Sequence, residues 1–256
     1  MFETFFEILI LSFVQGISEF IPVSSSAHLF LISEIYQFKS KFLLVDIGLH
    51  LGSLLAIVFY FRNDLLNILN NKNLLTLMFV GSLPIIIIGY IIYETGLISH
   101  LRNIEVISWT TLVFAIALYL VDKFKVKKKF ETDLNLKSIL VIGSLQIFAL
   151  IPGVSRSGIT ITLGRFLGFN RYDSAKISFF LSIPTLFAAS ILGMYNIYKE
   201  GSPELNFLAI ISIIFSFIFS YLTISFFLKF IRTSSLNIFV IYRLIFSLFI
   251  LAVVYL

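Results

Sequence analysis

Long apolar runs dominate the chain, and their lengths predict helices that cross a membrane. A bilayer-spanning helix needs about 20 mostly apolar residues. Six stretches approach that length: 42–61, 74–93, 104–122, 174–195, 205–228 and 236–256. The hydrophobic pattern therefore predicts six transmembrane helices.

Two further apolar regions are interrupted near their middle. Residues 2–37 are broken at "IPVSSSAH" and residues 138–168 at "IPGVSRSG", which leaves arms of about 10–14 residues, too short to cross a bilayer. Unwound backbone at membrane depth is tolerated where protein or a wet cavity satisfies its polar groups. We therefore expect each region to form a re-entrant helical hairpin.

These elements divide the chain into two halves of the same plan. Residues 1–122 and 138–256 each contain one interrupted hairpin followed by three spans, and a basic linker, 123–137, joins them within one membrane domain, 1–256. Because three is odd, the second half should lie inverted, with the hairpins entering from opposite faces and meeting near the midplane. The predicted fold is an all-α polytopic bundle: six transmembrane helices and two re-entrant hairpins in an inverted repeat.

Composition agrees with a membrane protein. Of the 256 residues 59% are hydrophobic and 13% are charged, the latter about half the share in a soluble domain. The absence of cysteine excludes disulfides, thiolate metal sites and cysteine nucleophiles. The net charge of +5 reflects topology in such a chain and does not imply a nucleic-acid partner.

The linker gives the orientation. It carries six lysines, and loops rich in Lys and Arg face the cytoplasm. Counting spans outward places twelve basic residues on that side and four on the other, leaves Arg156, Arg165 and Arg243 in the membrane, and puts both termini outside. The first residues lack a basic stretch and a small-residue cleavage site, so we expect the first segment to belong to the mature fold.

The two breaks have the residues of helix ends. Pro22 and Pro152 should end the incoming arms, because proline lacks the amide hydrogen that a helix interior needs. Ser24 or Ser25, and Ser155, are good N-caps for the outgoing arms. Two helix N-termini pointing at each other would make an anion site. The alternative is that the breaks are kinks packed by small residues.

Arg156 favours the anion site. A guanidinium near the bilayer centre costs at least about 2.5–3.5 kcal/mol, so it needs an anionic partner. That partner is either Glu19, in a structural ion pair, or a bound phosphate, which the planar guanidinium fits well. Nearby residues offer close backbone approach or donors to phosphate oxygens: Gly153, Ser157, Gly158 and Thr160.

The first hairpin adds reactive groups. Gln15 and Glu19 are four residues apart on one helix face, and His28 follows Ser25 by three residues. An acid, a hydroxyl and an imidazole are the minimum set for activating a nucleophile and protonating a leaving group. Taken singly, His28 is better explained as a hydrogen-bonding residue between helices.

Two other polar sites lie in the spans. Asp46 and His50 are four residues apart on one face, and they form either a support for the reactive groups or a simple polar pair. We favour support. Arg243, in the last span, needs an internal partner that the sequence does not name.

These motifs resemble a known family, the bacterial undecaprenyl pyrophosphate phosphatases or bacitracin-resistance membrane proteins. "QGISEFIPVSSSAH" resembles the first family motif and "PGVSRSGITIT" the second, and the likeness covers essentially the whole chain. The resemblance implies a bacterial inner-membrane enzyme that removes the terminal phosphate from a C55 isoprenyl pyrophosphate and so regenerates the lipid carrier of cell-wall synthesis.

The resemblance also implies functional residues. By position they are Glu19, Ser25, His28, Ser155, Arg156 and Thr160. The chain departs from the family at Gln15, a position that is acidic in some members, and at His50, where glutamine is common. A glutamine cannot act as a base, so Glu19 must supply the carboxylate alone.

The resulting hypothesis has four catalytic residues. Arg156 binds the pyrophosphate, Ser25 attacks the terminal phosphorus, and Glu19 and His28 handle protons; alternatively His28 is the nucleophile. The expected substrate-binding residues are Gln15, Ser24, Ser26, Gly153, Ser155, Ser157, Gly158 and Thr160.

The expected partners are a prenyl pyrophosphate lipid and membrane lipids, with a homodimer left open. No organic cofactor is expected. The resemblance suggests Mg²⁺ or Ca²⁺, and because Glu19 is the one evident hard ligand we expect such a cation to accompany the pyrophosphate rather than to occupy a protein-made site. The rival hypothesis is a secondary transporter or lipid flippase for a phosphate-bearing anion, because carriers share this architecture.

Overall fold

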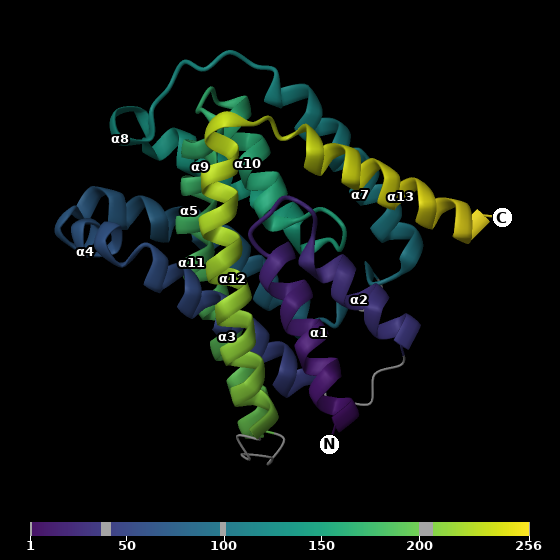
Figure 1. Ribbon diagram of the computed structural model, residues 1–256. Coiled ribbons are helices and arrows are strands. Elements are labelled where there is room, and N and C mark those ends of the chain that lie inside the picture. Colours follow the sequence, from purple (N-terminus) through teal and green to yellow (C-terminus); the bar gives the residue numbers. More distant parts are fainter. Residues whose placement is uncertain (1, 37–41, 98–100, 200–206, 256) are drawn as a thin grey trace.

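The computed structural model describes residues 2–36, 42–97, 101–199 and 207–255, and these are helical apart from turns and one isolated bridge between Lys128 and Phe169 (Figure 1). The long helices are α3 (Phe42–Tyr60), α5 (Lys72–Glu94), α7 (Ile104–Asp122), α11 (Arg171–Lys199), α12 (Phe207–Thr233) and α13 (Asn237–Tyr255). The remaining elements are α1 (Phe2–Ser18), α2 (Ser25–Tyr36), α4 (Arg62–Asn70), α8 (Phe130–Asp133), α9 (Leu136–Leu145), the 3-10 helix η1 (Gln146–Leu150) and α10 (Arg156–Phe166). The expected all-α class is confirmed.

Five helices of the described chain are long and apolar enough to cross a membrane: α5, α7, α11, α12 and α13. At 23 residues α5 is about 34 Å long, which exceeds the hydrocarbon thickness of a bilayer. The span expected at 42–61 corresponds to α3, which has 19 residues, as many as α7 and α13, but whose stretch Leu44–Tyr60 counts among the shorter apolar helices. The protein is therefore a multi-pass membrane protein, and a sixth crossing by α3 stays a prediction.

Both expected interruptions are present. Residues 19–24 separate α1 from α2, and residues 151–155 separate η1 from α10; a proline lies in each turn. The incoming helix α1 has 17 residues, longer than the arms expected from the sequence, because its polar residues Gln15 and Ser18 continue the helix instead of ending it.

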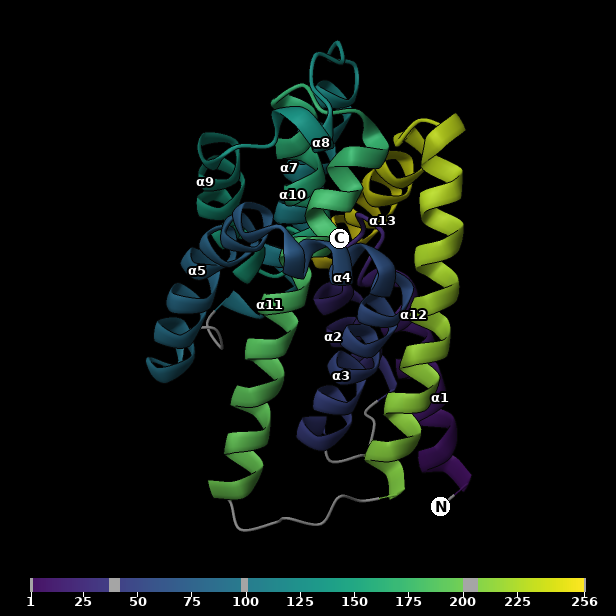
Figure 2. The same ribbon diagram turned by 90° about the vertical axis from the view of Figure 1, so that its left-hand side faces the viewer.

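The two hairpins approach each other from opposite ends of the molecule. In Figures 1 and 2, α1 and α2 extend toward the N-terminal end, whereas α9 and α10 extend toward the end that carries α8. Their breaks touch, since the Ser157 hydroxyl donates a hydrogen bond of 2.8 Å to the carbonyl oxygen of Ile21. The site is built where these breaks meet.

Small residues let the surrounding helices pack closely. On α3, Gly48 and Gly52 lie directly against α12, where an added Cβ at Gly52 would meet the side chain of Ser216 at 2.7 Å. The Ser216 hydroxyl donates to the carbonyl oxygen of Leu49 at 2.6 Å. Small side chains and hydroxyls are the usual means of association between membrane helices, and here they fix α12 beside the first hairpin.

Helix α4 was not predicted. It follows α3 after a turn at Phe61 and is attached to α11 by an ion pair of 2.7 Å between Asp64 and Lys176. Its mixed polar and apolar sequence, "RNDLLNILN", contains no uninterrupted apolar run, so the lengths of the apolar stretches do not indicate it.

Candidate active site

The carboxylate of Glu19 is the centre of the hydrogen bonds at the meeting point of the breaks. Its Oε1 accepts from Arg156 Nη2 at 3.0 Å, and its Oε2 accepts from the Ser25 hydroxyl at 2.7 Å and from the Gln15 amide at 3.1 Å. Glu19 is 7% exposed. Of the two partners expected for Arg156, Glu19 or a phosphate, Glu19 is bonded to it in this structure, and this ion pair joins the two hairpins.

Arg156 begins α10, and its guanidinium lies between Glu19 and α11. Besides the bond to Glu19, its Nη1 donates to the carbonyl oxygen of Ser178 at 3.1 Å. These bonds use two of the five donors of the fork. The side chain is 12% exposed, so this cation is held in place with donors available to an anion.

The residues before the two outgoing helices share an unusual backbone conformation. Ser24 precedes α2 with φ of 81°, and Ser155 precedes α10 with φ of 73°. Such conformations cost a non-glycine residue about 1–3 kcal/mol. Ser155 is the N-cap of α10 and accepts from Gly158 N at 3.0 Å, as predicted, while Ser24 holds the corresponding position before α2.

Ser157 and Thr160, expected to face a phosphate, bind other protein groups in this structure and attach α10 to the first hairpin and to α11. Ser157 donates to Ile21 across the breaks, and Thr160 Oγ1 lies 2.7 Å from both the carbonyl oxygen of Arg156 and the hydroxyl of Ser178. Ser157 and Thr160 are buried. Ser26, in contrast, is exposed, with its hydroxyl 3.4 Å from that of Ser24.

Gly153, in the second break, and Gly158, in the first turn of α10, approach protein rather than an open cavity. An added Cβ at Gly153, which has φ of 91°, would overlap Thr110 Oγ1 and lie 2.5 Å from the carbonyl oxygen of Ile107 on α7. One at Gly158 would lie 2.9 Å from Arg243 Nη1. The sequence predicted that these glycines let phosphate oxygens approach the backbone; in this structure their close neighbours are α7 and Arg243, and an approach by phosphate stays a prediction.

The imidazole of His28 makes its hydrogen bonds to Ser24 and Tyr242 and none to Glu19 or Ser25. Its Nδ1 lies 2.6 Å from the carbonyl oxygen of Ser24 and must donate there; in the neutral ring Nε2 then accepts from the Tyr242 hydroxyl, also at 2.6 Å. The ring stacks on Phe246 at 4.7 Å between centroids. The expected cluster of acid, hydroxyl and imidazole is thus formed by the first two, with the third held against α13. Tyr242 was not foreseen.

Asp46 and His50 pair as their spacing predicted. His50 Nδ1 donates to the carbonyl oxygen of Asp46 at 2.8 Å and lies 3.6 Å from its carboxylate. His50 is also close enough to Glu19 to interact with it electrostatically. The pair therefore lies beside the cluster, where a supporting role is consistent with its position.

Arg243, whose partner the sequence did not name, binds the backbone of both breaks. Its Nη1 donates to the carbonyl oxygen of Pro22 at 3.4 Å, and its Nη2 donates to those of Gly153 at 3.0 Å and Val154 at 3.2 Å. The side chain is fully buried. The position of Arg243 inside a predicted span indicated that it needs an internal partner. The unwound turns provide that partner as backbone carbonyl oxygens.

The residues at this site do not form a metal cage. Within the described residues no three His, Cys, Asp or Glu side chains gather as metal ligands. Both Glu19 oxygens already accept hydrogen bonds from Arg156, Ser25 and Gln15. A cation that depends on this carboxylate would have to displace those donors, so no chemical step is assigned here to a protein-bound metal.

Comparison with known proteins identifies relatives over the full chain. Residues 8–249 match the family model described as "Bacitracin resistance protein BacA". A protein named undecaprenyl-diphosphatase from Pelagibacter ubique is 56% identical over 256 residues, 100% of each chain. Proteins of the same name from Aliivibrio salmonicida and Erythrobacter litoralis are 38% and 35% identical, covering 97% and 94% of this chain and 98% and 96% of theirs.

Proposed function

Because the chain belongs to the bacitracin resistance protein BacA family, we propose that it hydrolyses undecaprenyl pyrophosphate to undecaprenyl phosphate and inorganic phosphate. This reaction regenerates the lipid carrier of peptidoglycan synthesis, and the family name connects it to bacitracin resistance. One observation carries the proposal at the level of residues: a hydroxyl, a carboxylate and a guanidinium converge where the two breaks meet.

In the proposed first step Ser25 is the nucleophile. Its Oγ forms a bond to the terminal phosphorus, the bond from that phosphorus to the bridging oxygen breaks, and undecaprenyl phosphate leaves. The hydroxyl proton passes to Glu19, which already accepts it in a hydrogen bond of 2.7 Å. In the second step water attacks the phosphoserine, which releases inorganic phosphate and restores Ser25.

Arg156 is proposed to stabilise the charge of the transferred phosphoryl group. Phosphoryl transfer depends mainly on positioning and charge stabilisation, and the fork of Arg156 is held at the site by Glu19 and by the Ser178 carbonyl. The ion pair with Glu19 balances the guanidinium while no substrate is bound. When a pyrophosphate arrives, its oxygens take up the remaining donors.

His28 is proposed to donate a proton to the leaving oxygen. In this structure both of its nitrogens are hydrogen-bonded, to Ser24 and Tyr242, so the ring has to rotate from α13 toward Ser25 to take part. In the alternative mechanism His28 is itself the nucleophile, and that mechanism needs the same rotation. Ser25 is favoured because it already contacts its base.

Any divalent cation is proposed to arrive with the substrate. The phosphate oxygens of a pyrophosphate are good ligands for Mg²⁺ or Ca²⁺, whereas the one carboxylate at the site is bonded to three donors. The cation then neutralises substrate charge without a protein-made cage.

The architecture is proposed to be an inverted repeat in one membrane domain, with both termini outside. The packing supports the inverted repeat, although it does not bear on which side the termini face: α1 packs on α12 as α9 packs on α5, α3 pairs with α11, and α7 pairs with α13. In this repeat α1, α3, α5 and α7 of the first half correspond to α9, α11, α12 and α13 of the second. Replacing each helix by its counterpart turns the α1–α12 contact into the α9–α5 contact and leaves the α3–α11 and α7–α13 pairs unchanged. The matching positive φ of Ser24 and Ser155 agrees with it.

The test is phosphate release by purified protein in detergent. Undecaprenyl pyrophosphate is the substrate, and Ser25→Ala and His28→Ala are compared with Ser234→Ala, a serine outside the cluster. We expect Ser25→Ala to lower kcat by about 100-fold or more and Ser234→Ala to have no effect. A transporter or flippase would release no phosphate where no gradient exists, and near-normal activity of both Ser25→Ala and His28→Ala would refute the assigned residues.

Acid quenching separates the two nucleophiles. A phosphoserine survives acid, whereas a phosphohistidine is hydrolysed. Substrate labelled at the terminal phosphate should therefore leave an acid-stable label on the wild type and none on Ser25→Ala. An acid-labile label that His28→Ala abolishes would establish the alternative mechanism.

A further inference from the structure

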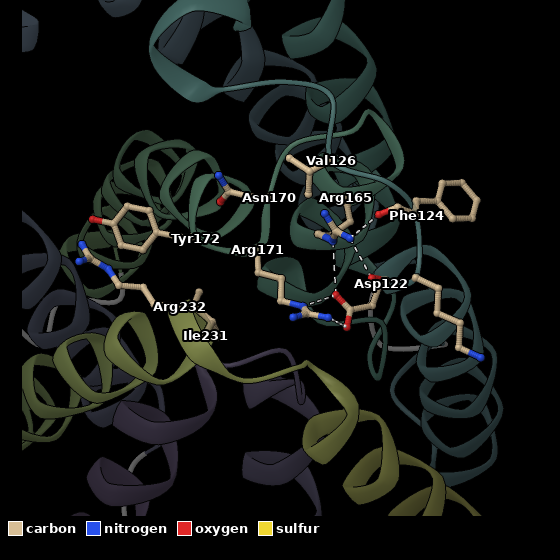
Figure 3. A pocket seen from close by; sticks show the side chains of 10 residues that line it. Asp122, Phe124, Val126, Arg165, Asn170, Arg171, Tyr172, Ile231 and Arg232 are labelled. Atoms are coloured by element: carbon tan, nitrogen blue, oxygen red, sulfur yellow. Dashed lines mark hydrogen bonds and ion pairs between the residues drawn. The ribbon is translucent and has the colours of Figure 1, made fainter.

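A recess of about 620 Å³ lies at the end of the molecule that carries the basic linker, away from the meeting point of the breaks. Four segments that are distant in sequence surround it: the end of α7 with the following linker, the end of α10, the start of α11 and the end of α12. Figure 3 shows their side chains around the opening. The volume falls in the range of ligand sites, about 300–1,000 Å³.

A buried ion pair network forms one wall of the recess. The carboxylate of Asp122 accepts from Arg165 Nε at 3.3 Å and from Arg171 Nε and Nη2 at 2.8 and 2.9 Å. Arg165 also donates to the carbonyl oxygens of Phe169 and Phe124 at 2.6 and 2.8 Å. Asp122 and Arg165 are 4% and 3% exposed. These contacts hold the side chains of the wall in place. They also pair the negative charge of Asp122 with Arg165 and Arg171.

The remaining cations of the recess are exposed and have no carboxylate partner within the described residues. Arg232 lies over the ring of Tyr172 at 4.4 Å, as Figure 3 shows, and Lys123 lies over the ring of Tyr119 at 3.8 Å. Four basic side chains therefore line the recess against the single carboxylate of Asp122. The excess positive charge favours the binding of an anion in the recess.

We propose that this recess binds the phosphate headgroup of an anionic membrane lipid. Guanidinium and ammonium groups are the usual partners of phosphate in proteins. The recess lies at the ends of α7 and α12, two helices long enough to cross the bilayer, and therefore at the level of lipid headgroups. Apolar Val126 and Ile231 also line it, which suits the glycerol and upper acyl chain of a lipid better than a free ion.

The test compares lipids on delipidated protein in detergent. Mixed micelles containing phosphatidylglycerol or phosphatidylcholine are titrated, and the Tm and the lipid retained in native mass spectrometry are measured. The double variant Lys123→Gln/Arg232→Gln removes the two exposed cations and leaves the buried network intact. Lys229→Gln is the matched control, because Lys229 is exposed one turn before Arg232 on α12 and does not line the recess.

We expect phosphatidylglycerol, but not phosphatidylcholine, to raise the Tm of the wild type. The concentration for half of this effect should rise at least about fivefold in the double variant, the change expected when charge-assisted contacts worth about 1 kcal/mol are lost, and should stay unchanged in Lys229→Gln. Equal weakening by Lys229→Gln would mean a general surface effect and overturn the proposal. So would equal effects of both lipids, or an equal Tm shift by inorganic phosphate alone, which would make the recess a free-anion site.

Discussion

At the scale of single residues, the site is organised by the need to pair buried charge. Glu19 and Arg156 are 137 positions apart, yet the sequence offers Glu19 as one of two partners of Arg156, the other being a phosphate, because each charge in a membrane protein requires a partner. The same reasoning could not find Tyr242, which binds His28. An imidazole accepts a hydrogen bond from any hydroxyl, and the chain contains eleven tyrosines and many serines.

Replacing Glu19 by glutamine should impair both activity and stability. The amide keeps the shape but removes the base for Ser25 and the counter-charge of Arg156, so kcat should fall by about 100-fold to 10,000-fold. An unpaired buried charge costs about 3–5 kcal/mol, and the Tm in detergent should fall as well. Phosphate release and thermal unfolding measure the two effects. Normal turnover with a lowered Tm would show that Glu19 is structural and not the base.

At the scale of elements, proline alone does not decide where a helix breaks. Pro84 and Pro184 lie inside the continuous helices α5 and α11, whereas Pro22 and Pro152 lie in turns. The neighbouring residues make the difference, because four isoleucines come after Pro84, whereas a serine that can begin a new helix comes shortly after Pro22 and Pro152. The break positions were therefore predictable from local sequence, and the length of α1 was not.

Arg243 should hold the two breaks together. We expect Arg243→Gln to lower the Tm, because three backbone carbonyls in the protein interior lose a charged donor, at about 1.5–3 kcal/mol for each such bond. The turnover number should fall together with the Tm, because the catalytic groups Glu19, Ser25 and Arg156 lie at both breaks. Arg102→Gln, in an exposed loop, serves as the control in thermal unfolding and phosphate release. An unchanged Tm in Arg243→Gln would contradict the bridging role.

At the scale of the whole molecule, the hairpins are asymmetric in how they are enclosed. α10 packs on α7, α9 and α11. The outgoing helix of the other hairpin, α2, packs on α1 and reaches α13 through the bond and stacking of His28 with Tyr242 and Phe246. Hydropathy does not distinguish the two hairpins, since both read as short apolar arms around a polar break. What distinguishes the two hairpins is the set of helices that pack around them.

Orientation can be tested directly, because the chain has no cysteine and any introduced thiol is unique. Lys127→Cys, in the linker, should react with a membrane-impermeant maleimide only after cells are permeabilised. Arg102→Cys, predicted to lie on the outer side, should react in intact cells. Both residues are exposed, so accessibility reports the side of the membrane. The reverse labelling pattern would invert the topology.

The sequence by itself determined the membrane class, the two breaks and the Ser155 cap, and it offered Glu19 as one of two partners for Arg156. Each follows from local hydropathy, local backbone chemistry or the cost of an unpaired charge. Tertiary structure decided the orientation of His28, the carbonyl partners of Arg243, the tight packing at Gly153 and the basic recess. Those depend on which surfaces of distant helices meet, and a neutral hydrogen bond or a close packing contact has many equivalent candidates along one chain.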